Sequence, residues 1–398
     1  MIERKAYMER LTGFRDKPVI KIVTGIRRCG KSTLLEMFQQ ELARDDVPTE
    51  RIVAINFEDY ANRPLLAPDA LHEHIVARMA KTGKTYVFLD EIQHVEDFQR
   101  VVDSLFLRKN LDLYLTGSNA WLLSGELATL LSGRYVEIEM LPLSFAEYVS
   151  TTGDRRELAR KYREYLENGA FPGALAFDGN RKLILDYLQG VYDSIVLKDV
   201  MGRYRIPDPL MLESLVGFAF DNIGGQLSTK RISDALKSAG RAMDVKTVER
   251  YLRALLDSYI LYRAKRYDVK GRQHLKTLEK YYAVDIGLRS LLLGKAGMDV
   301  GHVLENVVYL ELLRRGYRVY VGKVDEWEVD FVAMSEQGNE YFQVAATVRD
   351  EATLTRELRP LQKIADHYPK TLLTLDDDPD GDYAGVRRVN ALNWLLEG

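Results

Sequence analysis

The clearest chemical pattern in the sequence is a loop framed by two glycines that ends in a lysine and a serine. Gly25 opens this loop, and Gly30 closes it directly before Lys31 and Ser32. Glycines let backbone N–H groups approach phosphate oxygens, the lysine brings a charge to the β- and γ-phosphates, and the serine hydroxyl is a ligand for Mg²⁺. We therefore predict a site for ATP and Mg²⁺ formed by Gly25, Ile26, Arg27, Arg28, Cys29, Gly30, Lys31, Ser32 and Thr33.

Two adjacent carboxylates form a second pattern further along the chain. Asp90 and Glu91 directly follow the apolar run 86–89, and ligands of open α/β sheets lie at the carboxyl ends of such strands. We expect Asp90 to hold Mg²⁺ through water, together with Ser32, and Glu91 to polarise the attacking water. A glutamate after the aspartate favours a hydrolase over a small-molecule kinase, because a kinase needs no activated water.

Two further positions are candidates for contact with the γ-phosphate. Ser118 or Asn119, after the apolar run 113–115, is expected between the two patterns, where it would contact the γ-phosphate or the water; the alternative is an ordinary turn at the end of a strand. Arg134 follows a Ser-Gly turn. It is a candidate to neutralise charge in the transition state, in cis or from a neighbouring subunit; the alternative is a solvated or structural arginine.

Alternating strands and helices are needed to hold these side chains. The β-branched run 19–24 indicates a buried strand before the loop, and residues 33–44 have the pattern of a helix after it. Further strands are expected at 51–56, 86–89 and 113–117. This order predicts an α/β, three-layer P-loop nucleoside triphosphatase core.

The overall composition limits the remaining possibilities. The chain has 398 residues, a formal charge of −3 and a single cysteine, which excludes an intramolecular disulfide and a cysteine-rich metal site. The charged N-terminus lacks a signal-peptide core, and no apolar run approaches the roughly 18 to 20 residues of a membrane span. We expect a cytoplasmic protein of two or three domains that does not enter a membrane.

The succession of motifs resembles a known family of bacterial and archaeal ATPases. The motifs GIRRCGKST, VFLDEIQ, LTGSNA, LSGRY, LPLSFAEYV and YLENGAFPGAL occur in this order, similar to AAA_14-type ATPases that carry a C-terminal DUF4143 region. The resemblance implies an AAA+-like ATPase core, a middle winged helix and a C-terminal region similar to restriction endonucleases of the PD-(D/E)xK type. Because AAA+-like machines place catalytic arginines across subunit interfaces, we also expect a homo-oligomer.

Four segments follow from these patterns. We expect a P-loop ATPase domain at 1–140, a helical lid or connector at 141–209, a winged helix at 210–285 and a nuclease-like domain at 286–398. Within the third segment, helices are predicted at 211–225, 228–236 and 244–256, before two wing strands within 260–268 and 280–285. Two short helices and a turn before a wing are typical of a helix-turn-helix module.

Charge in this third segment favours contact with a polyanion. Residues 229–276 contain 13 lysines and arginines against 5 acids, an excess of eight positive charges. Lys246, Arg250 and Arg253 recur at helical spacing and are expected on one face, where they would contact the DNA backbone. The alternatives are a module that binds a protein partner and a solvated scaffold.

The C-terminal segment has the order of a metal-dependent nuclease but lacks part of its chemistry. Glu305 is expected on a helix, Asp330 on a strand, and Gln343 on the next strand. Such a centre needs carboxylates for Mg²⁺ and a lysine for the developing charge. Here Gln343 replaces an acid, and Ala345, at the lysine position, leaves no cation. We predict the fold of a nuclease without the activity.

The hypothesis that unites these observations is an Mg²⁺-dependent, AAA+-type ATPase that couples ATP to binding or remodelling of DNA. A slow nucleotide-dependent switch with a protein partner is the alternative, and an ATP-gated nuclease is the third.

Overall fold

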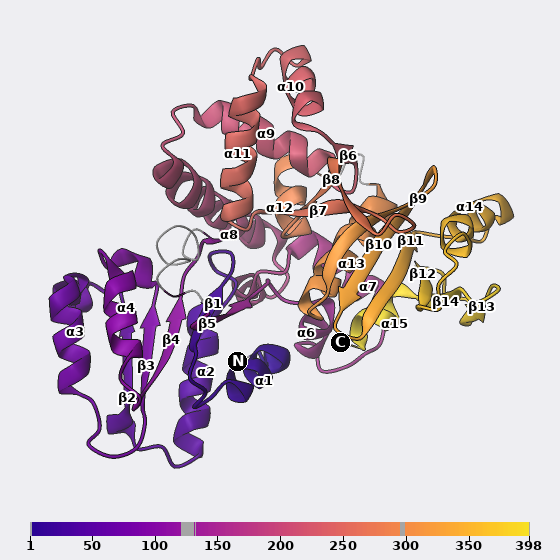
Figure 1. The fold of residues 1–398 in the computed structure, drawn as a ribbon. Helices are drawn as coiled ribbons and strands as arrows, with labels where there is room; N and C mark the ends of the chain where they lie inside the picture. The colour runs from indigo at the N-terminus through magenta and orange to yellow at the C-terminus, as the bar shows by residue number, and fades with distance from the viewer. Residues whose placement is uncertain (1, 121–130, 132, 295–298, 398) are drawn as a thin grey trace. The chain divides into compact units, whose positions relative to one another are not determined.

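The computed structural model describes residues 2–120, 131, 133–294 and 299–397. The chain divides into two compact units, Met1–Pro142 with Asp257–Tyr259, and Leu143–Leu256 with Ile260–Gly398 (Figure 1). Each unit contains one sheet, and the two units are described separately.

The first unit contains a five-stranded parallel sheet. Its strands are β1 (Ile20–Thr24), β2 (Ile52–Asn56), β3 (Thr85–Asp90), β4 (Leu111–Thr116) and β5 (Tyr135–Glu139). They lie in the order β2-β3-β4-β1-β5. Strand β4 therefore separates β1, which leads into the glycine loop, from β3, which ends in the acidic pair. The residues after these three strands all lie at the same edge of the sheet.

Helices cover both faces of this sheet. They are α1 (Lys5–Gly13), α2 (Lys31–Arg44), α3 (Pro68–Ala77) and α4 (Phe98–Phe106), with short 3₁₀ segments at Thr49–Arg51, Tyr60–Leu66 and Ile92–His94. Leu71 of α3 and Val102 of α4 share a buried core with the strands. On the other face, Phe38 of α2 packs against the rings of Phe88 and Tyr114. The predicted α/β, three-layer arrangement with a parallel sheet is confirmed.

The first half of the second unit is mainly helical. Its helices are α6 (Phe145–Ser150), α7 (Leu158–Asn168), α8 (Arg181–Asp193), α9 (Pro209–Asp221), α10 (Thr229–Ser238) and α11 (Val245–Asp257), with a 3₁₀ segment at Pro172–Phe177 and a π-helical segment at Ser194–Gly202. Side-chain hydrogen bonds to the backbone determine where several of these helices begin. The Ser144 and Glu147 side chains form a capping box at α6, and the Ser228 hydroxyl accepts from the Arg231 N–H at α10.

A nine-stranded mixed sheet forms the rest of the second unit. Its strands are β6 (Gln226–Leu227), β7 (Leu261–Asp268), β8 (Gln273–Ala283), β9 (Arg318–Val324), β10 (Trp327–Ser335), β11 (Gly338–Ala345), β12 (Lys370–Thr374), β13 (Gly381–Asp382) and β14 (Arg387–Asn390). They lie in the order β13-β14-β12-β11-β10-β9-β7-β8-β6. The accompanying helices are α12 (Ile286–Leu293), α13 (Val300–Arg314), α14 (Glu351–Gln362) and α15 (Ala391–Leu396).

The expected wing strands belong to this large sheet. Strands β7 and β8 form an antiparallel pair, but β7 also pairs in parallel with β9 through Lys265–Asp268. The sheet thus runs across the boundary expected at residue 285, and Leu143–Leu256 with Ile260–Gly398 group as one compact unit. Sequence periodicity predicted the strands, but partners far apart in sequence determine the sheet to which they belong.

Among the helices that the structure describes, none combines the length and the hydrophobicity that a membrane span requires.

Candidate functional site

The glycine loop joins β1 to α2, and its backbone conformation disfavours a side chain at either glycine position. Gly25 has φ of +132°, and a Cβ atom there would lie 2.1 Å from the Met140 carbonyl oxygen. Gly30 has φ of +106° directly before α2. Arg28 also has a positive φ, 68°. Because α2 begins without a side-chain cap, the N–H groups of its first turn remain available to an anion.

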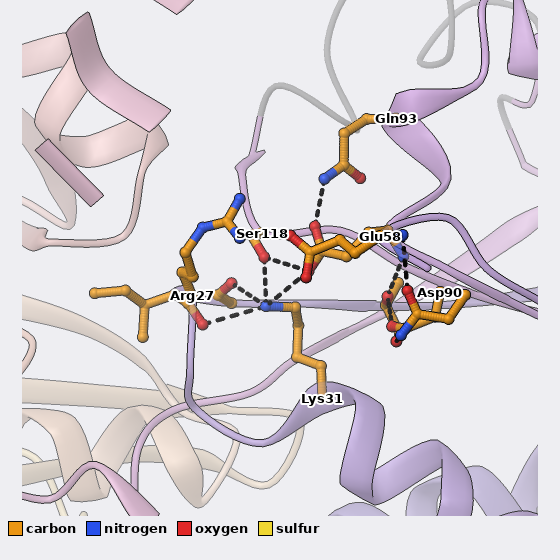
Figure 2. Close-up of polar contacts among 11 residues, drawn as sticks. Arg27, Lys31, Glu58, Asp90, Gln93 and Ser118 are labelled. Carbon is orange, nitrogen blue, oxygen red and sulfur yellow. Dashed lines mark hydrogen bonds and ion pairs between the residues drawn. The ribbon is translucent and has the colours of Figure 1, made fainter. Parts of the chain in front are cut away.

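The Ser118 hydroxyl lies against Lys31 (Figure 2) and joins it to Glu91. The Lys31 ammonium donates to the Ser118 hydroxyl at 2.8 Å, and to the carbonyl oxygens of Gly25 at 3.1 Å and Ile26 at 3.2 Å. Ser118 in turn donates to the Glu91 carboxylate, whose Oε1 lies 3.7 Å from the Lys31 nitrogen. Strand β4 therefore places a hydroxyl between the lysine of one motif and the glutamate of the other.

The backbone of Glu91 has a conformation that residues other than glycine seldom adopt. Its φ of 53° lies in the left-handed region, and its N–H donates to the Thr116 hydroxyl at 2.8 Å. Such strain is common at functional sites. Burial opposes ionisation of this carboxyl group, but Lys31 and hydrogen bonds from Ser118 and Gln93 outweigh it and lower the pKa of Glu91 below its ordinary value. Glu91 is therefore an ionised acceptor at neutral pH.

Asp90 lies among oxygen and amide groups that suit a hydrated magnesium ion. It accepts hydrogen bonds from the Thr116 and Ser32 hydroxyls, and from the Asn56 amide at 3.0 Å. Burial raises the pKa of Asp90, and a bound cation would favour the charged form. A cavity of about 270 Å³ adjoins Ser32 and Asp90. This donor set, a hydroxyl and a carboxylate beside open space, fits Mg²⁺.

The other side chains of the loop have different environments. Arg27 forms an ion pair with Glu58 after β2, with 2.8 Å between nitrogen and oxygen (Figure 2). Ile26 and Cys29 are buried, whereas Arg28 and Thr33 are exposed. Burial raises the pKa of the Cys29 thiol, so this single cysteine is a packing residue rather than a nucleophile.

Arg134 lies at the wrong edge of the sheet to act on this site. Its carbonyl oxygen accepts from the Ile20 N–H, and the next residue, Tyr135, pairs with Ile20 at the amino end of β1. Gly25 lies five residues further on, roughly 16 Å away at about 3.3 Å per residue. The Arg134 guanidinium instead pairs with Asp103 and covers the Phe106 ring. The expected role in cis is therefore wrong, because sequence spacing did not show at which edge the arginine lies.

The basic face predicted in the second unit lies on α11. The Asp244 carboxylate accepts from the N–H groups of Lys246 and Thr247 and thereby caps this helix. Lys246, Arg250 and Arg253 are exposed, and the opposite face of α11 is buried through Val248, Tyr251, Leu252 and Leu255. Exposed basic residues continue onto α10 and the following turn at Lys230, Arg231, Lys237 and Arg241. The Lys276 side chain lies outside the described part.

The C-terminal acids meet in the second unit. Glu305 comes from α13, and Asp330 and Glu328 come from β10, whose pairing with β9 shifts register between Val329 and Val332. The three acids line a cavity of about 650 Å³ together with Gln343. Gln343 is already engaged. Its amide oxygen accepts from the Asp330 N–H at 3.3 Å, and its amide nitrogen donates to Glu357 at 2.9 Å.

Lys280 supplies a cation that sequence reasoning did not find. Its ammonium lies 2.8 Å from Glu305, 2.8 Å from Glu328 and 3.7 Å from Asp330, and its side chain is 4% exposed. The expectation that Ala345 leaves the centre without a cation is therefore wrong. Burial lowers the pKa of Lys280, but Glu305, Asp330 and Glu328 together raise it above its ordinary value, so it is an ammonium at neutral pH. No local pattern marks Lys280, because its partners lie 25 or more residues away.

The first unit has the fold of an AAA+-like P-loop ATPase. A model described as an AAA domain, AAA_14, matches residues 17–149. A Walker-type ATPase of Pyrococcus abyssi has a similar fold, with a TM-score of 0.52 and 16% identity over 73% of this chain and 96% of that chain. The resemblance implied a C-terminal DUF4143 region. The model that matches beyond the AAA domain is instead a domain of unknown function, DUF8612, at residues 159–299.

Whole-chain relatives define the family. An uncharacterized protein of Haemophilus influenzae is 38% identical over 401 residues, which cover 100% of this chain and 99% of that protein. The chain belongs to the family of this protein. An uncharacterized protein of Methanocaldococcus jannaschii is 28% identical over 362 residues, which cover 86% of this chain and 78% of that protein.

Proposed function

We propose that this chain is an Mg²⁺-dependent ATPase that couples ATP binding and hydrolysis to binding or remodelling of DNA. The observation that carries the ATPase part is the hydrogen-bonded series Lys31–Ser118–Glu91 at the carboxyl edge of the first sheet. In this series the Ser118 hydroxyl bridges a cation that would bind phosphate, Lys31, and an ionised base, Glu91. Hydrolysis of a phosphoanhydride requires such a cation and such a base at one site.

Each residue of this series has a distinct part in the proposal. The loop N–H groups and Lys31 bind the β- and γ-phosphates, and this binding competes with the contacts of Lys31 to Ser118 and to the loop carbonyls. Ser118, once it no longer accepts from Lys31, is free to contact the γ-phosphate or the water. Glu91 then accepts a proton from the attacking water, for which its lowered pKa keeps it ionised. Ser32 and Asp90 would hold Mg²⁺, which neutralises phosphate charge.

Arg134 enters the proposal only through a second copy of the chain. Its position at the amino edge excludes contact with the nucleotide of its own chain, but its side chain is 41% exposed and so reachable by a neighbouring molecule. We propose a homo-oligomer in which Arg134 contacts the nucleotide of an adjacent copy.

The second part of the proposal assigns DNA contact to the exposed basic face of α10 and α11. Helices α9, α10 and α11 followed by the β7–β8 hairpin have the element order of a winged helix. The exposed cations on α11 stand on a helix whose other face is packed, so that they are presented on a fixed surface. Phosphate contacts of this kind give affinity with little sequence preference.

Reversing the charge of this face should abolish DNA binding. We expect the triple variant Lys246→Glu, Arg250→Glu and Arg253→Glu to bind duplex DNA at least about 100-fold more weakly than the wild type. The plot of log affinity against log salt should also become less steep, by about 0.9 for each phosphate that the variant no longer neutralises. Fluorescence anisotropy of labelled DNA across a salt series measures both quantities.

A second triple variant controls for the change in net charge. Arg155, Arg156 and Arg163 are exposed residues of the same unit outside the basic face. Their replacement by glutamate changes the charge by the same amount and should leave DNA affinity within about threefold of the wild type. Equally weakened binding in the two variants, or unchanged binding in the first, would contradict the assignment of the DNA surface.

A further inference from the structure

The carboxylates of Glu305, Glu328 and Asp330 in the second unit surround a lysine ammonium, where a metal site would have a metal ion. Glu305 and Glu328 each approach the Lys280 nitrogen at 2.8 Å, and Asp330 lies at 3.7 Å. Acids from a helix and a strand thus converge on one point, as the ligands of a divalent cation do. The group at that point is a side chain of the chain itself.

The residues that would have to bind a metal are already occupied. The Glu305 carboxylate also accepts from the Tyr282 hydroxyl at 2.6 Å, and the second oxygen of Asp330 accepts from the Val344 N–H at 2.9 Å. The oxygen of Gln343 accepts from the Asp330 backbone. With the Lys280 ammonium between these acids, no three acidic, histidine or cysteine side chains among the described residues are arranged to hold a metal ion.

The Lys280 ammonium and a divalent cation cannot both lie among these three acids. Mg²⁺ requires oxygen ligands at about 2.0–2.1 Å in near-octahedral order, and a positive charge at the centre would repel it. A lysine that served a phosphodiester reaction would instead stand beside the metal and toward the substrate phosphate. Lys280 lies among the acids at the wall of the cavity and is 4% exposed, so its charge is engaged by carboxylates rather than presented to an incoming phosphate.

The position of Lys280 in the sheet gives this ion pair network a structural role. Strands β7 and β9 separate β8 from β10 in the order of the sheet, yet Lys280 of β8 contacts Glu328 and Asp330 of β10. Gln226 of β6, next to β8, also donates to Glu328. The network thereby joins the β6–β8 end of the sheet to β10 and to helix α13.

We propose that the Lys280 ammonium occupies the cation position of this centre in place of a divalent metal, so that the region binds no Mg²⁺ or Mn²⁺ and does not cleave DNA. The ion pairs between the lysine and the acids hold β8, which follows the basic helix α11, against β10 and α13. This inference does not depend on the ATPase assignment, because its residues all lie in the second unit.

Titration with Mn²⁺ in the absence of nucleotide tests the inference on the full chain. Free Mn²⁺ is measured by electron paramagnetic resonance for the wild type and for Asp330→Asn. We expect the two proteins to bind the same amount, since Asp330 holds no metal in the wild type. Mn²⁺ binding that is present in the wild type and absent from Asp330→Asn would overturn the proposal.

Removal of the lysine tests the other half of the inference. We expect Lys280→Ala to acquire one Mn²⁺ site, at least tenfold tighter than any site of the wild type, and Lys280→Ala with Asp330→Asn to lack it. Circular dichroism establishes that the variants are folded, and Lys280→Gln, which keeps most of the side-chain volume, replaces Lys280→Ala if the latter does not fold. A folded, neutral variant that acquires no Mn²⁺ site would show that Lys280 does not fill a cation position.

Discussion

Replacing Lys31 with alanine should lower kcat/KM for ATP by a factor on the order of 10² to 10³, the effect typical of removing one preorganised group that stabilises transition-state charge. The ammonium is the one buried cation that contacts Ser118 and Glu91 among the described side chains. Its removal takes away the charge that meets the β- and γ-phosphates and leaves Glu91 buried without its countercharge. Phosphate release measures turnover, and a fluorescent ATP analogue measures binding.

A lysine outside the site provides the control for this variant. Lys5 belongs to the same unit, and its side chain is 78% exposed in an ion pair with Glu9. Surface pairs of this kind contribute little to stability, so Lys5→Ala should turn over ATP like the wild type. Turnover by Lys31→Ala within tenfold of Lys5→Ala would refute the phosphate-binding role of Lys31.

Replacing Glu91 with glutamine should separate ATP binding from hydrolysis. Glutamine keeps an oxygen that can accept from Ser118, but it cannot take a proton from water. We expect kcat to fall by about 10² to 10⁴, whereas affinity for the ATP analogue should stay within about threefold of the wild type. The comparison of kcat with the binding constant therefore distinguishes a missing base from a damaged pocket.

The matched control for Glu91→Gln is an exposed glutamate of the same loop. Glu96 lies five residues further along and is exposed, so Glu96→Gln changes the net charge equally without reaching the network of Lys31 and Ser118. It should keep wild-type kcat. Wild-type kcat in Glu91→Gln would remove Glu91 from the catalytic role and leave it as a partner of Lys31.

Local sequence patterns predicted residues that the structure brings together in the candidate nucleotide site. The glycine loop is recognisable because its backbone has positive φ at Gly25 and Gly30, which favours glycine at these two positions. The apolar runs before Asp90 and Ser118 predicted strands whose ends carry polar groups. Because all strands of this sheet are parallel, these ends lie at one edge, and the order of the strands brings Ser118 between Lys31 and Glu91.

Features that depend on distant pairing could not be predicted. The sequence shows Arg134 before a strand, but only the register of β5 against β1 shows that it lies at the amino edge. The β7–β8 pair was predicted as a wing, but its pairing with β9 through a parallel ladder has no local signal. Lys280 belongs to the same class. Its role depends on contacts between β8 and β10, which are not neighbours in the sheet.

Steady-state ATPase activity of the full chain, with and without single-stranded, duplex and branched DNA at low and physiological salt, tests the central claim most directly. We expect a low basal rate that one form of DNA raises at least severalfold, and we expect the variant with Lys246, Arg250 and Arg253 changed to glutamate to lose this stimulation and keep the basal rate. A rate that no form of DNA changes would contradict the coupling of ATP to DNA and favour a nucleotide-dependent switch that binds a protein partner.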